Sequence, residues 1–302
     1  MPDEDKFVAL RTAFAGKHCP AIFAGPVMKR LIALAMALAL PAASPAVAAP
    51  WQLSGSDVVS LSAPDGHNYQ IMIAWPEGAP PATGWPVLWM LDGADNFATA
   101  ALTARRLSRV SERSGVGPGV IVAIDSGPLA RRVLDYTPHV PGYRIPEGAP
   151  ASGLPIGGAD AFLGFIAKQA RPYVAQRLKI DPARETLMGH SLGGLVALHA
   201  LASGAEFSRY VAISPSLWYG NGALAQSIAR APLTAGRQLL IAHGEREGGP
   251  SGGDSAETIV TALKHRGVDA RHSILAGQTH GSTMLASMAQ GVTIAFATEA
   301  KP

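Results

Sequence analysis

The sequence predicts an α/β protein: a mostly parallel central sheet of about eight strands with helices on both faces. After residue 50, short apolar runs rich in β-branched residues alternate with longer helical stretches, which is the pattern of strand–helix–strand units. Several of these runs are apolar without interruption, as expected for parallel strands buried on both faces. Hydrophobic residues make up 48% of the chain and charged residues 16%, a composition typical of globular domains.

The first strands are predicted at 57–62 and 69–75, where a Pro-Asp-Gly turn at 64–66 would join them as an antiparallel edge. The parallel part then begins with apolar strands at 86–91 and 120–124, separated by an amphipathic helix over 97–112.

Four more strands and five more helices complete the expected order. The strands are predicted at 186–188, 210–213, 238–242 and 271–275, and the helices at 161–178, 193–202, 221–230, 255–266 and 282–297. Residues 126–158 are rich in Gly and Pro and form a long connection for a compact domain, a kind of loop that often lies over a functional site. This loop would leave the carboxyl end of the fourth strand, where open α/β sheets bind ligands.

The segment 28–48 has the features of a secretory signal peptide. Lys29 and Arg30 precede the apolar run 31–40, and small residues follow as far as Ala-Val-Ala at 46–48. The run is shorter than the about 20 residues that a membrane-spanning helix needs. We therefore expect a catalytic domain over 49–302 that is periplasmic or secreted and not held in a membrane.

A complete export signal beginning at Met28 suggests that translation starts there and that residues 1–27 are an upstream extension. An unusually long positively charged region before the apolar run is the alternative. Cys19, the only cysteine, lies in this stretch, so the mature chain would have no disulfide. The formal net charge is +3 and the basic residues are dispersed, which argues against a nucleic-acid partner.

The segment Gly189-His190-Ser191-Leu192-Gly193 matches the Gly-x-Ser-x-Gly pattern of a nucleophile elbow. It lies between a short apolar strand and an amphipathic helix, which is the context that the motif requires. Glycines two positions before and after the serine allow a sharp strand-to-helix turn in which side chains would clash. The motif therefore makes Ser191 the candidate nucleophile and specifies the predicted architecture as an α/β-hydrolase fold.

A serine hydroxyl needs a neighbouring base, and in this fold the base follows the acid in the chain. His280 lies after the last strand and before the last helix, which is the expected position. A solvated residue at a helix start is the alternative for His280. The other histidines after Ser191 lie on helices, inside a strand or too early in the topology: His199, His243, His265 and His272.

The acid that orients the base should follow the strand 238–242. Glu247 is the first choice, Glu245 the second, and Asp254 is also available, although carboxylates on a glycine-rich loop are often only solvated. The spacing of acidic residues in this loop does not match a calcium-binding loop. We expect no metal ion and no cofactor.

The oxyanion that forms during acyl transfer needs two preorganised donors. One would be the N–H of Leu192, directly after the nucleophile. The second should come from the loop after the strand 86–91, as the N–H of Gly93 or Ala94. Asp92 in the same loop is expected to have a structural role.

Several motifs together resemble the esterase D-like (putative esterase) branch of the α/β-hydrolases, and within it the periplasmic trilactone esterases that open catecholate siderophores. The motifs are LDG at 91–93, RVLDYTP at 132–138, GHSLGG at 189–194, SPSLW at 214–218 and THGS at 279–282. The resemblance implies that Arg132 contacts anionic catecholate oxygens, with an ordinary surface arginine as the alternative. Some members look like Ser–His dyads that lack a well-placed acid.

The sequence thus predicts an exported serine carboxylic-ester hydrolase that acts on a small-molecule ester through an acyl-enzyme. The resemblance implies a siderophore trilactone as substrate, while secreted feruloyl or acetyl esterases would share the same elbow and signal. An acyltransferase of the same fold and a non-catalytic binding protein on a hydrolase scaffold are the remaining alternatives.

Overall fold

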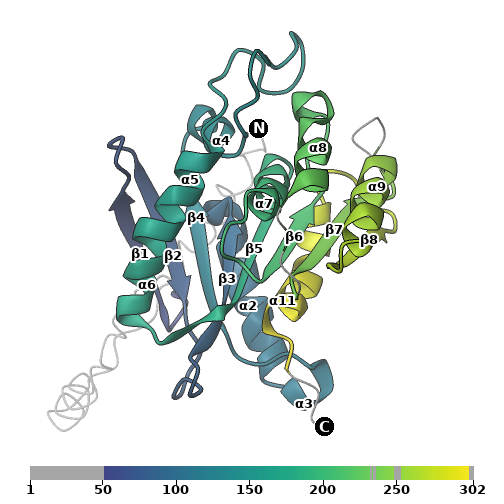
Figure 1. The fold of residues 1–302 in the computed structure, drawn as a ribbon. Coiled ribbons are helices and arrows are strands. Elements are labelled where there is room, and N and C mark those ends of the chain that lie inside the picture. The colour runs from purple at the N-terminus through teal and green to yellow at the C-terminus, as the bar shows by residue number, and fades with distance from the viewer. Residues whose placement is uncertain (1–50, 232, 234–235, 248–252, 299–302) are drawn as a thin grey trace, which may run out of the picture. The chain divides into compact units, whose positions relative to one another are not determined.

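The computed structural model describes residues 51–231, 233, 236–247 and 253–298 (Figure 1). The chain divides into two compact units, Met1–Gln52 and Leu53–Pro302, and the fold described below is that of the second unit. The predicted signal peptide at 28–48 and the upstream extension at 1–27 lie outside the described residues. Among the described helices, none has the length and apolar character needed to cross a lipid bilayer.

A single eight-stranded sheet organises this unit, in the order β1-β2-β4-β3-β5-β6-β7-β8. The first two strands form the predicted antiparallel edge, β2 also pairs antiparallel with β4, and all other neighbours are parallel. The prediction of a mostly parallel sheet of about eight strands is confirmed. The strands are β1 (Ser56–Ser62), β2 (Asn68–Ala74), β3 (Trp85–Leu91), β4 (Val120–Asp125), β5 (Ile180–His190), β6 (Arg209–Ile213), β7 (Gln238–Gly244) and β8 (Asp269–Leu275).

The central strand β3 shows why the sheet needs cover on both faces. Its alternate side chains enter two different cores: Val87 and Trp89 pack in one, and Leu88 and Met90 in the other. All seven residues of β3 are buried. A strand of this kind has no face left for solvent, so helices must cover both sides of the sheet.

Helices from different parts of the chain cover the two faces (Figure 1). One face is covered by α2 (Gly93–Ser108) and α11 (Met288–Phe296), which also contact each other. On the other face α7 (Leu192–Ala202) packs on β5 and β6, and α9 (Gly253–Lys264) packs on β7 and β8. Shorter elements complete the order: α3 (Ser111–Ser114), α4 (Leu129–Asp135), α5 (Ala159–Phe165), α6 (Arg171–Arg177), α8 (Ala223–Arg230), α10 (Thr283–Ala286) and a 3₁₀ turn, Tyr219–Gly222.

The structure differs from the predicted elements where proline or polar residues interrupt the pattern. The single helix expected over 161–178 is divided into α5, a π turn at Ile166–Ala170, and α6, whose second residue is Pro172. Proline cannot donate to the carbonyl of the preceding turn, and a π turn accommodates the lost bond. The last helix, expected over 282–297, is also divided, into α10 and α11.

The sequence did not predict the start of β5 or the helix α4. Strand β5 begins at Ile180 rather than near residue 186, because its first half contains Pro182 and charged residues and therefore lacks an apolar run. The loop 126–158, expected to be irregular throughout, contains the helix α4 directly after β4.

A buried ion pair fixes α6 to the sheet and gives a stability prediction. Arg171 Nε donates to Glu185 Oε2 at 2.8 Å, and Trp89 Nε1 donates to the same oxygen at 2.9 Å. The Glu185 side chain is 1% exposed, and burial raises its pKa although Arg171 opposes this. Replacing Arg171 by alanine should lower the free energy of unfolding by about 3 to 5 kcal/mol at neutral pH, because a carboxylate is left buried and unpaired.

The loss should be smaller at pH 5 than at pH 8. A carboxyl whose pKa is raised in the folded state binds its proton more tightly there than in the unfolded chain. The free energy of unfolding therefore falls as the pH rises from the pKa of the unfolded chain through the pKa of the folded state. Urea unfolding at the two pH values measures this. Arg177→Ala is the matched control, because its 3.5 Å pair with Asp57 is half exposed and should contribute less than about 1 kcal/mol. Equal losses in the two variants would contradict the prediction.

Candidate active site

The nucleophile elbow lies where β5 ends at His190 and α7 begins at Leu192. Between them Ser191 has φ 59° and ψ −118°, a conformation that is unfavourable for a residue with a side chain. A hydrogen bond from Ser191 N to Ile213 O, 2.9 Å long, holds the turn against the end of β6. The serine hydroxyl is thereby presented at the carboxyl edge of the parallel strands, as in a nucleophile elbow.

The glycines around Ser191 are required to different degrees. A Cβ on Gly189 would lie 2.4 Å from Gly193 O, and one on Gly194 would lie 3.0 Å from Ile213 O. At Gly193, however, a Cβ would make only ordinary contacts of 3.5 Å with Leu91. The expected clash is therefore wrong for Gly193. The close contact in this turn is between Gly189 and the backbone of Gly193, and a Cβ on Gly193 itself would be accommodated without a clash.

The structure brings Ser191, His280 and Glu247 into one hydrogen-bonded chain. His280 lies on the loop between β8 and α10, and its Nε2 is 3.1 Å from Ser191 Oγ. Its Nδ1 is 3.2 Å from Glu247 Oε2. Each ring nitrogen therefore faces one partner, an arrangement in which Nδ1 donates to the carboxylate and Nε2 can accept the serine proton.

The other histidines after Ser191 have different surroundings. His199 pairs with Asp160 at 2.7 Å on α5, and His243 and His272 stack on each other with ring centres 4.6 Å apart. Neither of these two contacts involves Ser191.

Glu247 is held by groups that favour its ionised form. Its Oε1 accepts from Ser214 Oγ at 2.5 Å and from Gly244 N at 2.6 Å. Burial alone would raise the pKa of Glu247, but these two donors and the neighbouring His280 outweigh it and hold the pKa below its usual value. Glu247 is thus a carboxylate at neutral pH.

The alternative acid Glu245 has a different partner. Glu245 is exposed, and its Oε2 accepts from Gly277 N at 2.7 Å. The side chain of Asp254 lies outside the described part of the structure.

Three residues that sequence reasoning did not assign support this hydrogen-bonded chain. Ser214, at the end of β6, links Glu247 to Thr283 Oγ1 at 2.7 Å, and Thr283 in turn donates to His280 O at 3.0 Å. His190 Nε2 lies 2.8 Å from the same carbonyl, and its ring is 4.7 Å from the His280 ring. Burial and the neighbouring His280 lower the pKa of His190. The SPSLW and GHSLGG motifs contain Ser214 and His190, and Thr283 follows the THGS motif, but a motif does not reveal which partner each side chain meets.

The candidate oxyanion donors are not equivalent. Leu192 and Gly93 are the first residues of α7 and α2, where helical N–H groups have no intrahelical acceptor. The N–H of Ala94, by contrast, donates to Asp125 Oδ2 at 2.9 Å. Of the two alternatives for the second donor, the N–H of Ala94 already has another acceptor in this structure, so Gly93 is the better candidate.

Arg132 lies on α4 beside the elbow and is not a free surface arginine. Its Nε and Nη2 contact Asp92 Oδ1 and Oδ2 at 2.5 and 2.9 Å, and Nη2 also reaches His190 O at 3.4 Å. Asp92 has a left-handed backbone with φ 54° and occupies the N-cap position of α2, although its side chain makes no capping hydrogen bond. This ion pair agrees with the expected structural role of Asp92. The sequence did not reveal that Arg132 is its partner.

No group of three or more His, Cys, Asp or Glu side chains that could hold a metal ion occurs among the described residues. The arrangement around Ser191 consists of a hydroxyl, an imidazole and a carboxylate joined by hydrogen bonds.

Comparisons with known proteins match the chain to esterases. The family model described as "Putative esterase" matches residues 62–257. The siderophore enterobactin esterase of Emericella nidulans is 38% identical over 64% of the chain, and the match covers 62% of that relative, less than two thirds of its length. The ferri-bacillibactin esterase BesA of Bacillus subtilis is 30% identical over 77% of the chain and 86% of its own. Among solved structures, the siderophore hydrolase EstA from Aspergillus nidulans superposes with a TM-score of 0.67 at 28% identity, over 82% of this chain and 97% of its own.

Proposed function

Because the chain belongs to the Putative esterase family of α/β-hydrolases, we propose that it is a serine esterase that hydrolyses the ester bonds of a siderophore. The observation that carries the proposal is the hydrogen-bonded chain from Ser191 through His280 to Glu247, with distances of 3.1 and 3.2 Å. These are hydrogen-bond distances that permit proton transfer from the serine to the imidazole.

The proposed reaction proceeds through an acyl-enzyme. Ser191 Oγ attacks the ester carbonyl carbon while His280 Nε2 takes the hydroxyl proton, and the N–H groups of Leu192 and Gly93 stabilise the oxyanion. When the tetrahedral intermediate collapses, the ester C–O bond breaks and the alcohol leaves with the proton from His280. Water then attacks the acyl-enzyme with His280 as base, which releases the acid and restores Ser191. Glu247 accepts a hydrogen bond from Nδ1–H of His280 throughout and stabilises the charged imidazole.

Arg132 is the proposed contact for the acidic oxygens of the substrate. Its ion pair with Asp92 uses Nε and Nη2, which leaves Nη1 for a substrate oxygen beside Ser191. Because the pair fixes the guanidinium, little conformational entropy would be lost when a substrate binds.

We further propose that the protein is exported to the periplasm or secreted, since 28–48 reads as a signal peptide. Amino-terminal sequencing of the protein recovered from its host should begin at Ala49. A chain that begins at Met1 or Met28 would refute export by this signal.

Incubation with a catecholate trilactone tests the substrate. With ferric or iron-free enterobactin, mass spectrometry should detect the linear trimer, formed by addition of one water to one ester. If the trilactone stays intact at equimolar enzyme while p-nitrophenyl acetate is hydrolysed, the protein is an esterase, but its substrate is not this siderophore. Turnover that accelerates when an alcohol is added, with the transferred ester as product, would instead identify an acyltransferase.

A further inference from the structure

At the junction of β3 and α2, two of three consecutive N–H groups have acceptors within the protein. Asp92 N donates to Tyr136 Oη at 3.1 Å, and Ala94 N donates to Asp125 Oδ2 at 2.9 Å. The N–H of Gly93 lies between them and, as the first of α2, has no intrahelical acceptor. A Cβ on Gly93 would lie 3.0 Å from the backbone of β4, so the sheet also confines this residue. The contacts of its two neighbours therefore fix the direction of the Gly93 N–H.

Tyr136 and Arg132 hold Asp92 at two different groups. Arg132 lies on α4 and Tyr136 directly follows its last residue, a spacing of four that places side chains on one face of a helix. Tyr136 is fully buried, and the guanidinium of Arg132 lies 5.1 Å from the centre of its ring. The phenol binds the N–H of Asp92 and the guanidinium binds its carboxylate. A left-handed backbone outside glycine persists only where the surroundings fix it, and these two contacts supply that constraint at Asp92.

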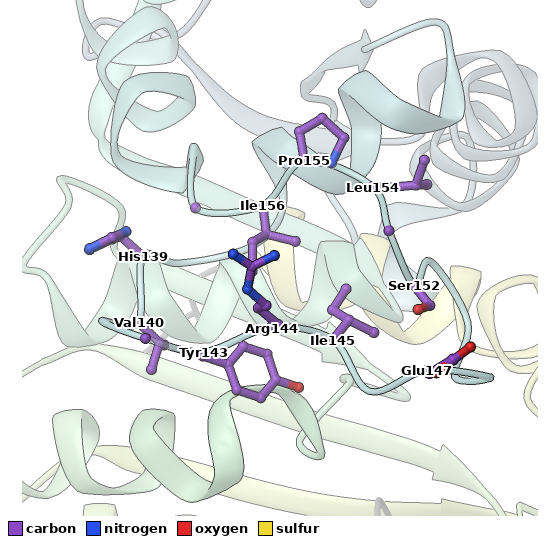
Figure 2. A pocket seen from close by; sticks show the side chains of 13 residues that line it. His139, Val140, Tyr143, Arg144, Ile145, Glu147, Ser152, Leu154, Pro155 and Ile156 are labelled. Atoms are coloured by element: carbon purple, nitrogen blue, oxygen red, sulfur yellow. The ribbon is translucent and has the colours of Figure 1, made fainter.

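Arg132 also reaches the segment that carries the other candidate donor. Its Nη2 lies 3.4 Å from His190 O, a longer contact than the one with Asp92, and His190 comes two positions before Leu192. One guanidinium thus touches both donor segments. Neither Arg132 nor Tyr136 belongs to the wall of the cavity of about 590 Å³ in the loop after α4, which residues within 139–157 line (Figure 2). Substitutions at these two positions therefore change no residue of the cavity wall.

We propose that Tyr136 and Arg132 are positioning residues for the oxyanion hole, which hold the N–H groups of Gly93 and Leu192 in place relative to each other. The assignment rests on the proposed function, in which these two groups stabilise the oxyanion. Such donors are most effective when they are already aimed at the position where the charge develops. The phenol and the guanidinium act through the backbone and do not touch the reacting ester. This role of Arg132 is additional to its proposed contact with acidic oxygens, because it would also affect esters that have none.

Tyr136→Phe tests the proposal with p-nitrophenyl acetate, an ester without an anionic group. Phenylalanine keeps the ring beside Arg132 and removes only the acceptor of the Asp92 N–H. We expect kcat to fall about tenfold or more with KM nearly unchanged, because the oxyanion forms only after the substrate is bound. Arg132→Ala should show the same pattern.

A trifluoromethyl ketone measures the oxyanion hole without turnover. Its carbonyl carbon forms a bond with Ser191 Oγ, the hydroxyl proton passes to His280, and the carbonyl oxygen becomes an oxyanion that stays in the hole. In Tyr136→Phe the ketone should therefore lose affinity by about the same factor as kcat/KM falls. An unchanged ketone affinity together with an unchanged kcat would overturn the proposal.

Tyr210→Phe is the matched control. Tyr210 is also fully buried, but its Oη donates to Ala205 O at 2.7 Å, and it lies near the amino end of β6, whereas Ser191 N contacts the carboxyl end at Ile213. This variant should lower the melting temperature and leave kcat and ketone affinity unchanged. If Tyr136→Phe also lost only stability, the proposal would be wrong and the esterase assignment would stand.

Amide hydrogen exchange separates this proposal from the proposed function. If the wild type hydrolyses no ester, the proposed function fails, and exchange at residues 92–94, followed by nuclear magnetic resonance, still tests the contact. Exchange at these amides should be faster in Tyr136→Phe than in the wild type and unchanged in Tyr210→Phe. Equal exchange in Tyr136→Phe and the wild type would refute the positioning role. If Tyr136→Phe does not fold, Arg132→Ala decides by the same measurements.

Discussion

Replacing Ser191 by alanine is expected to lower kcat/KM for p-nitrophenyl acetate by at least about 10⁴-fold, because the reaction loses its nucleophile. The fold should survive, since alanine can occupy the elbow and the backbone bond from residue 191 to Ile213 does not involve the side chain. A fluorophosphonate probe should label the wild type at Ser191 and leave the variant unlabelled. This labelling also distinguishes an esterase from a binding protein on the same scaffold, because only an activated serine reacts.

Ser216→Ala provides the matched control for this experiment. Its hydroxyl lies 3.3 Å from Ser191 Oγ, but His280 Nε2 faces Ser191. The Ser216 variant should therefore keep labelling at Ser191 and lose less than about tenfold in activity, the order of one neutral hydrogen bond. If Ser191→Ala retained wild-type turnover while Ser216→Ala abolished it, Ser216 would be the nucleophile and the assignment of Ser191 would be wrong.

The sequence predicts those parts of the site that depend on chain order. A strand, a glycine-lined turn and a helix must follow one another around Ser191, and the topology then requires a base after the last strand, where only His280 is available. The sheet was also predictable, because a strand buried on both faces, such as β3, appears in the sequence as an uninterrupted apolar run.

Parts of the site that depend on contacts between distant segments could not be predicted. Glu245 and Glu247 are two residues apart on one loop, and only the folded positions of Ser214 and Gly244 distinguish the carboxylate that faces His280. The same holds for Arg132 and Asp92, which are 40 positions apart in the chain. A local pattern contains no information about such pairings unless the three-dimensional register is known.

Glu247→Gln is expected to lower kcat by about 10⁴-fold, although the substitution conserves shape. Oε1 accepts from Gly244 N and Ser214 Oγ, so the glutamine oxygen must take that position and its amide nitrogen must face His280 Nδ1. Because an amide nitrogen only donates, Nδ1 would have to accept and the ring proton would move to Nε2. An Nε2–H directed at Ser191 Oγ cannot take the serine proton, and this is the effect of the wrong tautomer in catalytic triads.

Glu245→Gln separates this effect from a general change in loop charge. Glu245 accepts from Gly277 N and does not contact His280, so steady-state kinetics of this variant should stay within a few fold of wild type. A Glu247→Gln enzyme with near-normal kcat would instead mean that Ser191 and His280 act as a dyad. In that case the hydrogen bonds of the His280 carbonyl with Thr283 and His190 would have to orient the imidazole alone. Those bonds fix the backbone of residue 280 but leave χ1 and χ2 of its side chain free, so a carboxylate at Nδ1 remains the stronger constraint on the ring.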